Sequence, residues 1–168
     1  MLNWMSVLWL STICTATLLG LFHLSIWIRQ DLQRENAVLA GLSFMVALCG
    51  IVELRALGVQ SPAEYAECLR WVHVFGSLIV VSVVIYVQMI VPGRRWLALF
   101  VYGSRLAAVI ANFTIGVSLS FLQIDELRWV SGWGGVSFPV PVGTSNPWFL
   151  LAQFNNLLTL GLMVDAMV

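Results

Sequence analysis

Long apolar stretches separated by short polar segments dominate this chain. A helix that crosses the hydrocarbon core of a bilayer needs about 20 consecutive apolar residues. Five stretches meet this requirement: residues 5–28, 37–57, 70–91, 96–122 and 148–168. The pattern predicts an all-α membrane protein, in which residues 1–168 form a single integral domain with a bundle of about five transmembrane helices.

The polar segments between the stretches have the composition of loops and helix ends. Residues 29–36 carry four charges, and residues 91–95 form a Pro-Gly turn with two arginines. Ser61, followed by Pro62 and Glu64, is typical of a helix N-terminus, where serine caps the helix and proline takes its first position. We therefore expect the third helix to begin at Pro62, ahead of its apolar stretch.

The longest break, residues 123–147, is rich in Gly, Pro, Ser and Trp. Within it, residues 128–131 and 136–142 alternate in polarity or are β-branched, with glycines between them. This pattern predicts an outer loop that forms a small hairpin or a glycine-rich lid. Pro139 and Pro141 limit the second strand to the edge of a sheet, because proline has no backbone N–H to donate.

Composition narrows the function classes. Hydrophobic residues make up 60% of the chain and charged residues 10%, with a net charge of zero. These values exclude a disordered chain and argue against a nucleic-acid binder, which needs a basic surface. They also argue against a water-soluble enzyme of this size. The chain carries no known catalytic motif, and its three cysteines lack metal-ligand spacing, so we expect no catalytic residues, no metal and no cofactor.

The arginines orient the predicted helices. With the N-terminus outside, the inner loops hold four arginines and two acids, and the outer loops hold three arginines and five acids. The short basic turn at Arg94 and Arg95 favours the inner side. Tryptophans near both ends of the predicted helices are typical of two interfacial belts. The sequence therefore predicts a multi-pass protein with its N-terminus outside and its C-terminus inside.

Arg105 is the most informative single residue, because it lies well inside the fourth apolar stretch. A charge at that depth costs at least about 2.5 kcal/mol and is expected to face the bundle with a partner. Ala108 and Asn112 share its helical face, and Asp165 near the end of the fifth stretch is a possible ion-pair partner. Two interpretations remain open: a pair that fixes helix packing, or a switch or ligand site.

Other polar residues could contribute to such a site. Gln153, Asn155 and Asn156 lie in the outer part of the fifth stretch, at a depth near that of Asn112, where amides form interhelical hydrogen bonds or bind a small ligand under the lid. Glu53 ends the second stretch. His73 is expected at the outer interface near Glu53 and Arg55, either as an ordinary interfacial histidine or as a pH sensor.

One set of features occurs in order along the chain. They are Glu53, the Arg70-Trp71-x-His73 group, Gly93-Arg94-Arg95-Trp96, Arg105 with Asn112, the V-x-x-G-x-x-x-P-W stretch at residues 140–148, and Asp165. Together they resemble the N-terminal multi-pass membrane region of bacterial sensor histidine kinases that contain PAS domains. The resemblance extends over nearly the whole chain from about His23.

The resemblance implies a sensory input domain in the bacterial inner membrane. It also implies cytoplasmic PAS and kinase modules after the last helix, and a homodimer. None of those modules lies within these 168 residues, and the resemblance supplies no ligand.

Two main functions are expected from the sequence. The first is a sensor of an apolar or amphipathic molecule, or of the state of the membrane, in which Arg105, Asn112, Asn156 and Asp165 form an internal polar network. The alternative is a small accessory subunit of a larger respiratory or photosynthetic membrane complex, which would bind lipid, quinone or pigment at an interface. A third, weaker interpretation is a subunit of a membrane enzyme or transporter.

Overall fold

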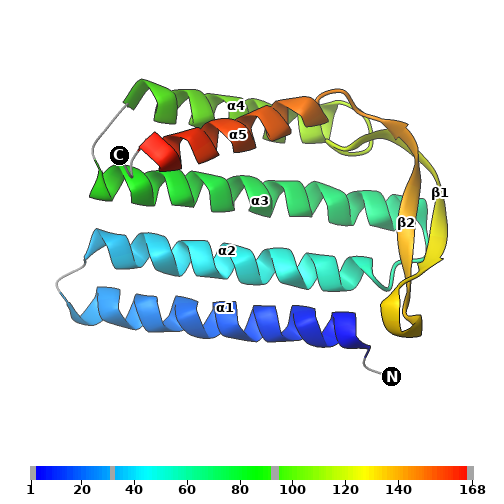
Figure 1. Cartoon of the computed structure of the whole chain (residues 1–168), viewed down its shortest axis with the longest axis horizontal. Helices are drawn as coiled ribbons and strands as arrows, with labels where there is room; N and C mark the ends of the chain where they lie inside the picture. Colours follow the sequence, from blue (N-terminus) through cyan, green and yellow to red (C-terminus); the bar gives the residue numbers. More distant parts are fainter. Residues whose placement is uncertain (1–2, 31–32, 92–94, 166–168) are drawn as a thin grey trace.

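Five α-helices and a two-stranded hairpin make up the fold in the computed structural model (Figure 1), which describes residues 3–30, 33–91 and 95–165. In chain order the elements are α1 (Trp4–Arg29), α2 (Arg34–Ala56), α3 (Pro62–Ile90), α4 (Arg95–Thr114), β1 (Phe121–Ser131), a 3₁₀ turn (Trp133–Gly135), β2 (Ser137–Ser145) and α5 (Phe149–Asp165).

The helices have the length and polarity of a membrane domain. Each of α1 to α4 is long and apolar enough to cross a bilayer, whereas α5 is apolar but has 17 described residues. Four of the five predicted spans are thus confirmed as helices of sufficient length, and the fifth span stays a prediction. Gly93 and Arg94 of the predicted inner turn, and residues 166–168 of the fifth stretch, lie outside the described residues.

The helices lie side by side and alternate in direction (Figure 1). α1 packs on α2 and α2 packs on α3, whereas α4 and α5 pack on α3 and on each other. The start of α1 and the hairpin lie at one end of the bundle, and α5 ends at the opposite end. α3 therefore connects the α1–α2 pair with the α4–α5 pair.

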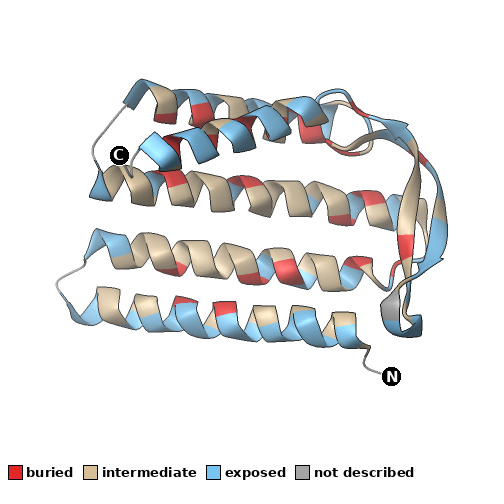
Figure 2. Ribbon diagram, in the orientation of Figure 1, coloured by how far each residue is buried: buried red, intermediate tan, exposed pale blue. Residues whose placement is uncertain are grey.

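Small residues allow close helix contacts. Gly20 of α1 lies against the ring of Phe44 of α2, and a Cβ on Gly20 would come within 2.7 Å of that ring. Figure 2 shows buried residues in the seams between helices and exposed residues on the outward faces, most clearly on α1. Many of the exposed residues are large and apolar. Such outward faces are compatible with lipid, because lipid does not penalise exposed apolar surface.

The N-terminus of α3 follows the sequence signal. Ser61 is the N-cap, and its side chain accepts a hydrogen bond of 3.3 Å from the backbone nitrogen of Glu64. Pro62 is the first helical residue. The predicted start of the third helix is therefore confirmed.

α4 ends at Thr114, well before residue 122, where the fourth apolar stretch was predicted to end. Gly116 reverses the chain: its φ is +75°, and a Cβ there would lie 2.6 Å from the Cα of Leu122. Asn112 holds this turn by accepting a hydrogen bond of 2.8 Å from the backbone nitrogen of Leu119. Because apolar side chains continue through the turn, hydropathy alone made the helix too long.

β1 and β2 pair as an antiparallel hairpin, which is one of the two forms predicted for residues 123–147 in an otherwise helical fold. Both strands are longer than the segments predicted at residues 128–131 and 136–142. Pro139 and Pro141 lie in β2, which is an edge of this two-stranded sheet as predicted. The small hairpin between the last two helices is thus confirmed.

The hairpin crosses the end of the bundle from the α4–α5 side toward α1 (Figure 1). Leu127 of β1 packs against Ala56, Val59 and Cys68, which join the end of α2 to the start of α3. At the hairpin turn, a Cβ on Gly134 would lie 3.3 Å from Trp4 of α1. The hairpin therefore covers one end of the bundle.

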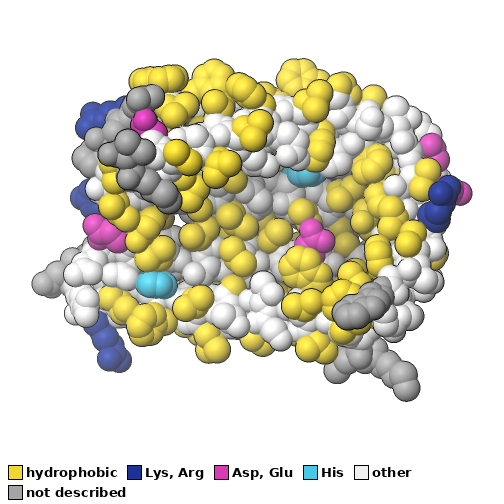
Figure 3. Space-filling view, in the orientation of Figure 1, with side chains coloured by type: hydrophobic (Ala, Val, Ile, Leu, Met, Phe, Trp, Pro, Cys, Tyr) yellow, Lys and Arg dark blue, Asp and Glu magenta, His cyan; other side chains and the backbone are white. Residues whose placement is uncertain are grey.

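The visible arginine side chains are separated from most of the apolar surface along the long axis, whereas an acidic side chain lies within the apolar face (Figure 3). Figure 3 shows arginine side chains at the two ends of the molecule and hydrophobic side chains over most of the face between them. Trp4 and Trp148 lie at the hairpin end, and Trp27 and Trp96 lie at the opposite end. This distribution is typical of a protein whose apolar middle lies in a bilayer.

Candidate functional site

Arg105 lies in the middle of α4, about 15 Å along the helix from its first residue. Only 6% of its surface is exposed. It shares the buried face of α4 with Val101, Ala108 and Asn112, at the three- and four-residue spacing of one helical face. The face predicted from the sequence is therefore confirmed, and a cation on it requires polar partners.

Two asparagines of α5 provide these partners. Arg105 donates a hydrogen bond of 2.5 Å from Nε to Oδ1 of Asn155, and a second from Nη2 to Oδ1 of Asn156. Nε and Nη2 lie on the same edge of the planar guanidinium, so the two amides bind one edge of the group together. A single charged side chain thus joins α4 to α5 at mid-length.

Asn155 is completely buried, and both of its polar side-chain atoms are in use. Its Nδ2 donates to the backbone oxygen of Val101 at 3.0 Å and to Oγ of Ser104 at 2.5 Å. Because the amide nitrogen is fixed by these two acceptors, Oδ1 faces Arg105. The position of α5 and the conformation of the Arg105 side chain therefore determine each other.

Neutral amides replace the ion pair between Arg105 and Asp165 that the sequence allowed. Asp165 lies ten residues beyond Asn155 on α5, which is about 15 Å along the helix axis. Within the described residues, no carboxylate lies at ion-pair distance from Arg105. Because arginine stays protonated in proteins, a full positive charge remains in an apolar bundle with no counter-ion among the described residues.

A groove of about 220 Å³ opens between α3 and α4, with Arg105 in its wall. Leu78 and Leu106 also line it and are 43% and 63% exposed, so the groove opens to the outside of the bundle. Ser77 and Tyr102 are its other polar side chains. The remaining lining residues are Val74, Val81 and Val109.

Asn112 belongs to a separate polar cluster. It lies seven residues after Arg105, about 10 Å farther along α4. Its Nδ2 donates to the backbone oxygen of Arg70 on α3 at 3.0 Å, while its Oδ1 accepts from Leu119 in the turn after α4. Asn112 therefore fixes the turn that leads into the hairpin, and it does not contact the guanidinium of Arg105.

The same turn binds two further polar residues, Asn146 and Arg70, which were not among the predicted site residues. Asn146 is 2% exposed and donates from Nδ2 to the backbone oxygens of Ile115 and Ser118, both at 3.0 Å. Arg70 donates from Nη2 to the backbone oxygen of Gly116 at 3.4 Å. The available signal for Asn146 was its place before Pro147, at the start of the last helix. These residues hold the hairpin against the bundle.

His73 also faces this turn, which corrects the position expected for it near Glu53 and Arg55. Its Nε2 lies 2.8 Å from Oγ of Ser120, and its ring meets the edge of Phe149 with centroids 6.3 Å apart. These partners lie in the turn after α4 and at the start of α5. His73 therefore contributes to packing at the hairpin end of α3, α4 and α5.

Glu53 lies apart from both clusters. It is half-buried near the end of α2. The four-residue network predicted from the sequence is thus divided: Arg105 and Asn156 are in contact, and Asn112 and Asp165 lie elsewhere. In residues 3–30, 33–91 and 95–165, no group of three or more His, Cys, Asp or Glu residues could hold a metal ion.

Comparison with protein-family models, with curated protein sequences and with solved structures finds no match to this chain.

Proposed function

We propose that this chain is a membrane-embedded signal-input domain in which Arg105 and its two asparagine partners set the position of the last helix. One observation carries the proposal: a buried charge in the middle of α4 holds α5 through neutral amides rather than through a counter-ion. We expect a signal to act beside Arg105, because hydrogen bonds to neutral amides compensate its charge only in part.

Electrostatics supplies the physical basis for a switch. A charge at the centre of a bilayer costs at least about 2.5 kcal/mol, and its interactions strengthen in a low dielectric. A ligand or a change in the membrane beside Arg105 therefore alters the relative free energy of two α4–α5 arrangements. A two-state equilibrium of this kind is what a sensor requires.

The topology of the proposal follows the order of the helices. α5 starts at the hairpin end and ends at the opposite end of the bundle, so a movement of α5 would carry a signal across the bilayer (Figure 1). We propose five spans in the bacterial inner membrane, with the N-terminus outside and the C-terminus inside. The resemblance adds PAS and kinase modules after α5, and a homodimer, as proposed partners.

The intact mass of the native protein tests this proposal most broadly. The present chain has a mass of 18.6 kDa. A much larger native mass, with cytoplasmic kinase sequence after α5, is expected for a sensor. A native mass near 18.6 kDa, together with stable co-purification in a large complex, would overturn the sensor proposal.

Arg105→Ala tests the role of the cluster itself. We expect the variant to insert into membranes at close to the normal amount, because the helix becomes more apolar, while the signalling output of the native protein changes. Protein in the membrane fraction and output in the same membranes are the two readouts. Unchanged output combined with failed assembly would make Arg105 a packing residue.

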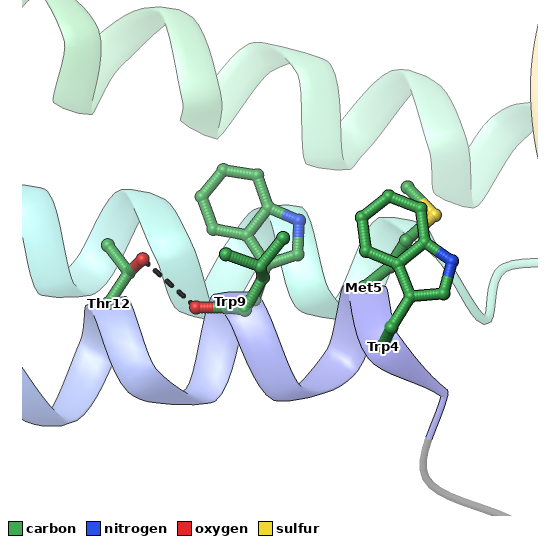
Figure 4. A pocket seen from close by; sticks show the side chains of 5 residues that line it. Trp4, Met5, Trp9 and Thr12 are labelled. Carbon is green, nitrogen blue, oxygen red and sulfur yellow. Dashed lines mark hydrogen bonds between the residues drawn. The ribbon is translucent and has the colours of Figure 1, made fainter. Parts of the chain in front are cut away.

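A second candidate function, the accessory subunit, is favoured by the outer face of α1. Figure 4 shows the indole rings of Trp4 and Trp9 projecting from α1, with Met5 beside Trp4, and Thr12 donates to the backbone oxygen of Leu8. These five residues line an apolar groove of about 290 Å³. Such a surface fits a neighbouring apolar helix, a lipid, a quinone or a pigment at the interface of a larger complex.

A further inference from the structure

Arg105 has a third guanidinium nitrogen that α5 does not bind. Nε and Nη2 are occupied by Asn155 and Asn156, whereas Nη1 has no hydrogen-bond partner within the described chain. Among the described residues, Nε of Arg70 is the one fully enclosed polar side-chain atom without a hydrogen-bond partner. Nη1 of Arg105 also lacks a partner and is therefore not fully enclosed. This nitrogen belongs to a residue that is 94% buried and that lines the α3–α4 groove.

Two hydroxyl groups line the same groove and also lack partners in the part of the chain that the structure describes. Ser77, which is 5% exposed, and Tyr102 make no hydrogen bond there. By contrast, Ser104 and Thr114 donate to backbone oxygens of their own helix, at 2.8 and 2.9 Å. No water is available in the bilayer core to replace the missing partners. Three side chains that can donate a hydrogen bond therefore line one groove, and the two hydroxyls among them can also accept.

We infer that the α3–α4 groove binds an amphipathic molecule with a carboxylate head and a long apolar tail. The carboxylate accepts from Nη1 of Arg105 and from the hydroxyls of Tyr102 and Ser77. An anion fits better than a neutral carbonyl, because Arg105 has no counter-ion within the described residues and a charge-assisted hydrogen bond is about twice as strong as a neutral one.

The dimensions of the groove indicate how the tail lies. A volume of about 220 Å³ is below the roughly 300 Å³ at which pockets for whole small molecules begin. The groove therefore holds the head and the first part of the tail. The rest of the tail extends past Leu78 and Leu106 into the lipid. The inference that the groove binds this molecule does not depend on the proposed function. Only the claim that the bound molecule is the signal rests on it.

Binding of radiolabelled palmitate to the chain in phosphatidylcholine nanodiscs tests the inference. Methyl palmitate, which has the same tail and no charge, serves as the competitor. The informative variants are Arg105→Gln, Tyr102→Phe and Ser77→Ala. Arg29→Gln is the matched control, because it removes an arginine at the exposed end of α1, outside the groove.

We expect saturable binding of palmitate, weakened at least about tenfold by Arg105→Gln and roughly two- to tenfold by each hydroxyl deletion. Arg29→Gln should bind as the wild type does. The inference is overturned if palmitate shows no saturable binding, or if methyl palmitate competes equally well, since the second result indicates a neutral occupant. If Arg105→Gln fails to fold, the Tyr102→Phe/Ser77→Ala double variant decides, and unchanged affinity in it overturns the inference.

The two proposals fail in different ways. If palmitate binds through Arg105 but leaves the distance between α3 and α5 unchanged, the ligand site stands and the sensor proposal fails. If palmitate does not bind while Arg105→Gln still moves α5, the ligand site fails and the sensor proposal stands. Spin labels on Ile85 and Leu160, which are exposed on α3 and α5, report that distance.

Discussion

Arg105 on α4 donates a hydrogen bond of 2.5 Å from Nε to Oδ1 of Asn155 on α5. The two residues are 50 positions apart in sequence, and the hairpin lies between them. This contact joins two helices at mid-length by a buried cation and a neutral amide. Hydrogen bonds between helices in membranes contribute about 0.6 kcal/mol on average and up to about 1.7 kcal/mol. The stability and the position of α5 are therefore expected to depend on this cluster.

Removing the Asn155 amide should loosen α5. Asn155→Ala is expected to lower the free energy of unfolding by about 2 kcal/mol, because it removes bonds to Arg105, Val101 and Ser104. Gln153→Ala is the control, since Gln153 is an exposed amide on the same helix. Unfolding by denaturing detergent measures both variants. Equal stability of the two would show that the Asn155 bonds contribute little.

A counter-ion for Arg105 should stabilise the protein. Asn156 is exposed on α5 and uses its Oδ1 to accept from Arg105. Asn156→Asp is expected to raise the free energy of unfolding by about 1 kcal/mol, because an ion pair replaces a bond to a neutral amide. The same variant should weaken palmitate binding, since the charge of Arg105 is then neutralised. If Asn156→Asp destabilises as much as Asn156→Ala does, Arg105 has no need of a counter-ion.

The turn after α4 should tolerate no side chain at Gly116. Its φ of +75° and the 2.6 Å approach to Leu122 make Gly116→Ala unfavourable by at least about 2 kcal/mol. Gly103→Ala is the matched control: a Cβ there meets nothing within 4 Å, and alanine in a helix is favoured over glycine by about 0.5–1 kcal/mol. The two substitutions should therefore change the melting temperature in opposite directions. A neutral Gly116→Ala would mean that the turn adopts another conformation.

Asn112 should protect the turn rather than the Arg105 cluster. Asn112→Leu is expected to increase hydrogen exchange at the Leu119 amide at least about fivefold, because that amide loses its acceptor. Thr114→Val, which removes an exposed hydroxyl from the same helix, should leave this exchange unchanged. If the Leu119 amide still exchanges slowly in the Asn112→Leu variant, a residue other than Asn112 holds the turn.

The helices could be predicted from the sequence because apolar length and one cap signal set most of their boundaries. Ser61 and Pro62 placed the start of α3 correctly. The end of α4 could not be placed, because the apolar run continues while Gly116 and Asn112 turn the chain. The full extent of the hairpin was missed for the same reason: its first residues belong to that apolar run.

The candidate site was predictable only in part. Helical spacing put Arg105 on a buried face together with Asn112, since both positions depend on the period of one helix. The partners of Arg105 and His73 depend on how far α5 slides along α4, which the turn and the hairpin determine. Asn155 thus took the place expected for Asp165, and Ser120 took the place expected for Glu53.

The distance between α3 and α5 tests the central claim most directly. Spin labels at Ile85 and Leu160, in a background where Cys14, Cys49 and Cys68 are replaced by serine, give this distance by pulsed electron paramagnetic resonance in nanodiscs. We predict that Arg105→Gln shifts or broadens the distance distribution, whereas Arg29→Gln leaves it as in the wild type. Identical distributions in all three proteins would contradict the claim that Arg105 sets the position of α5.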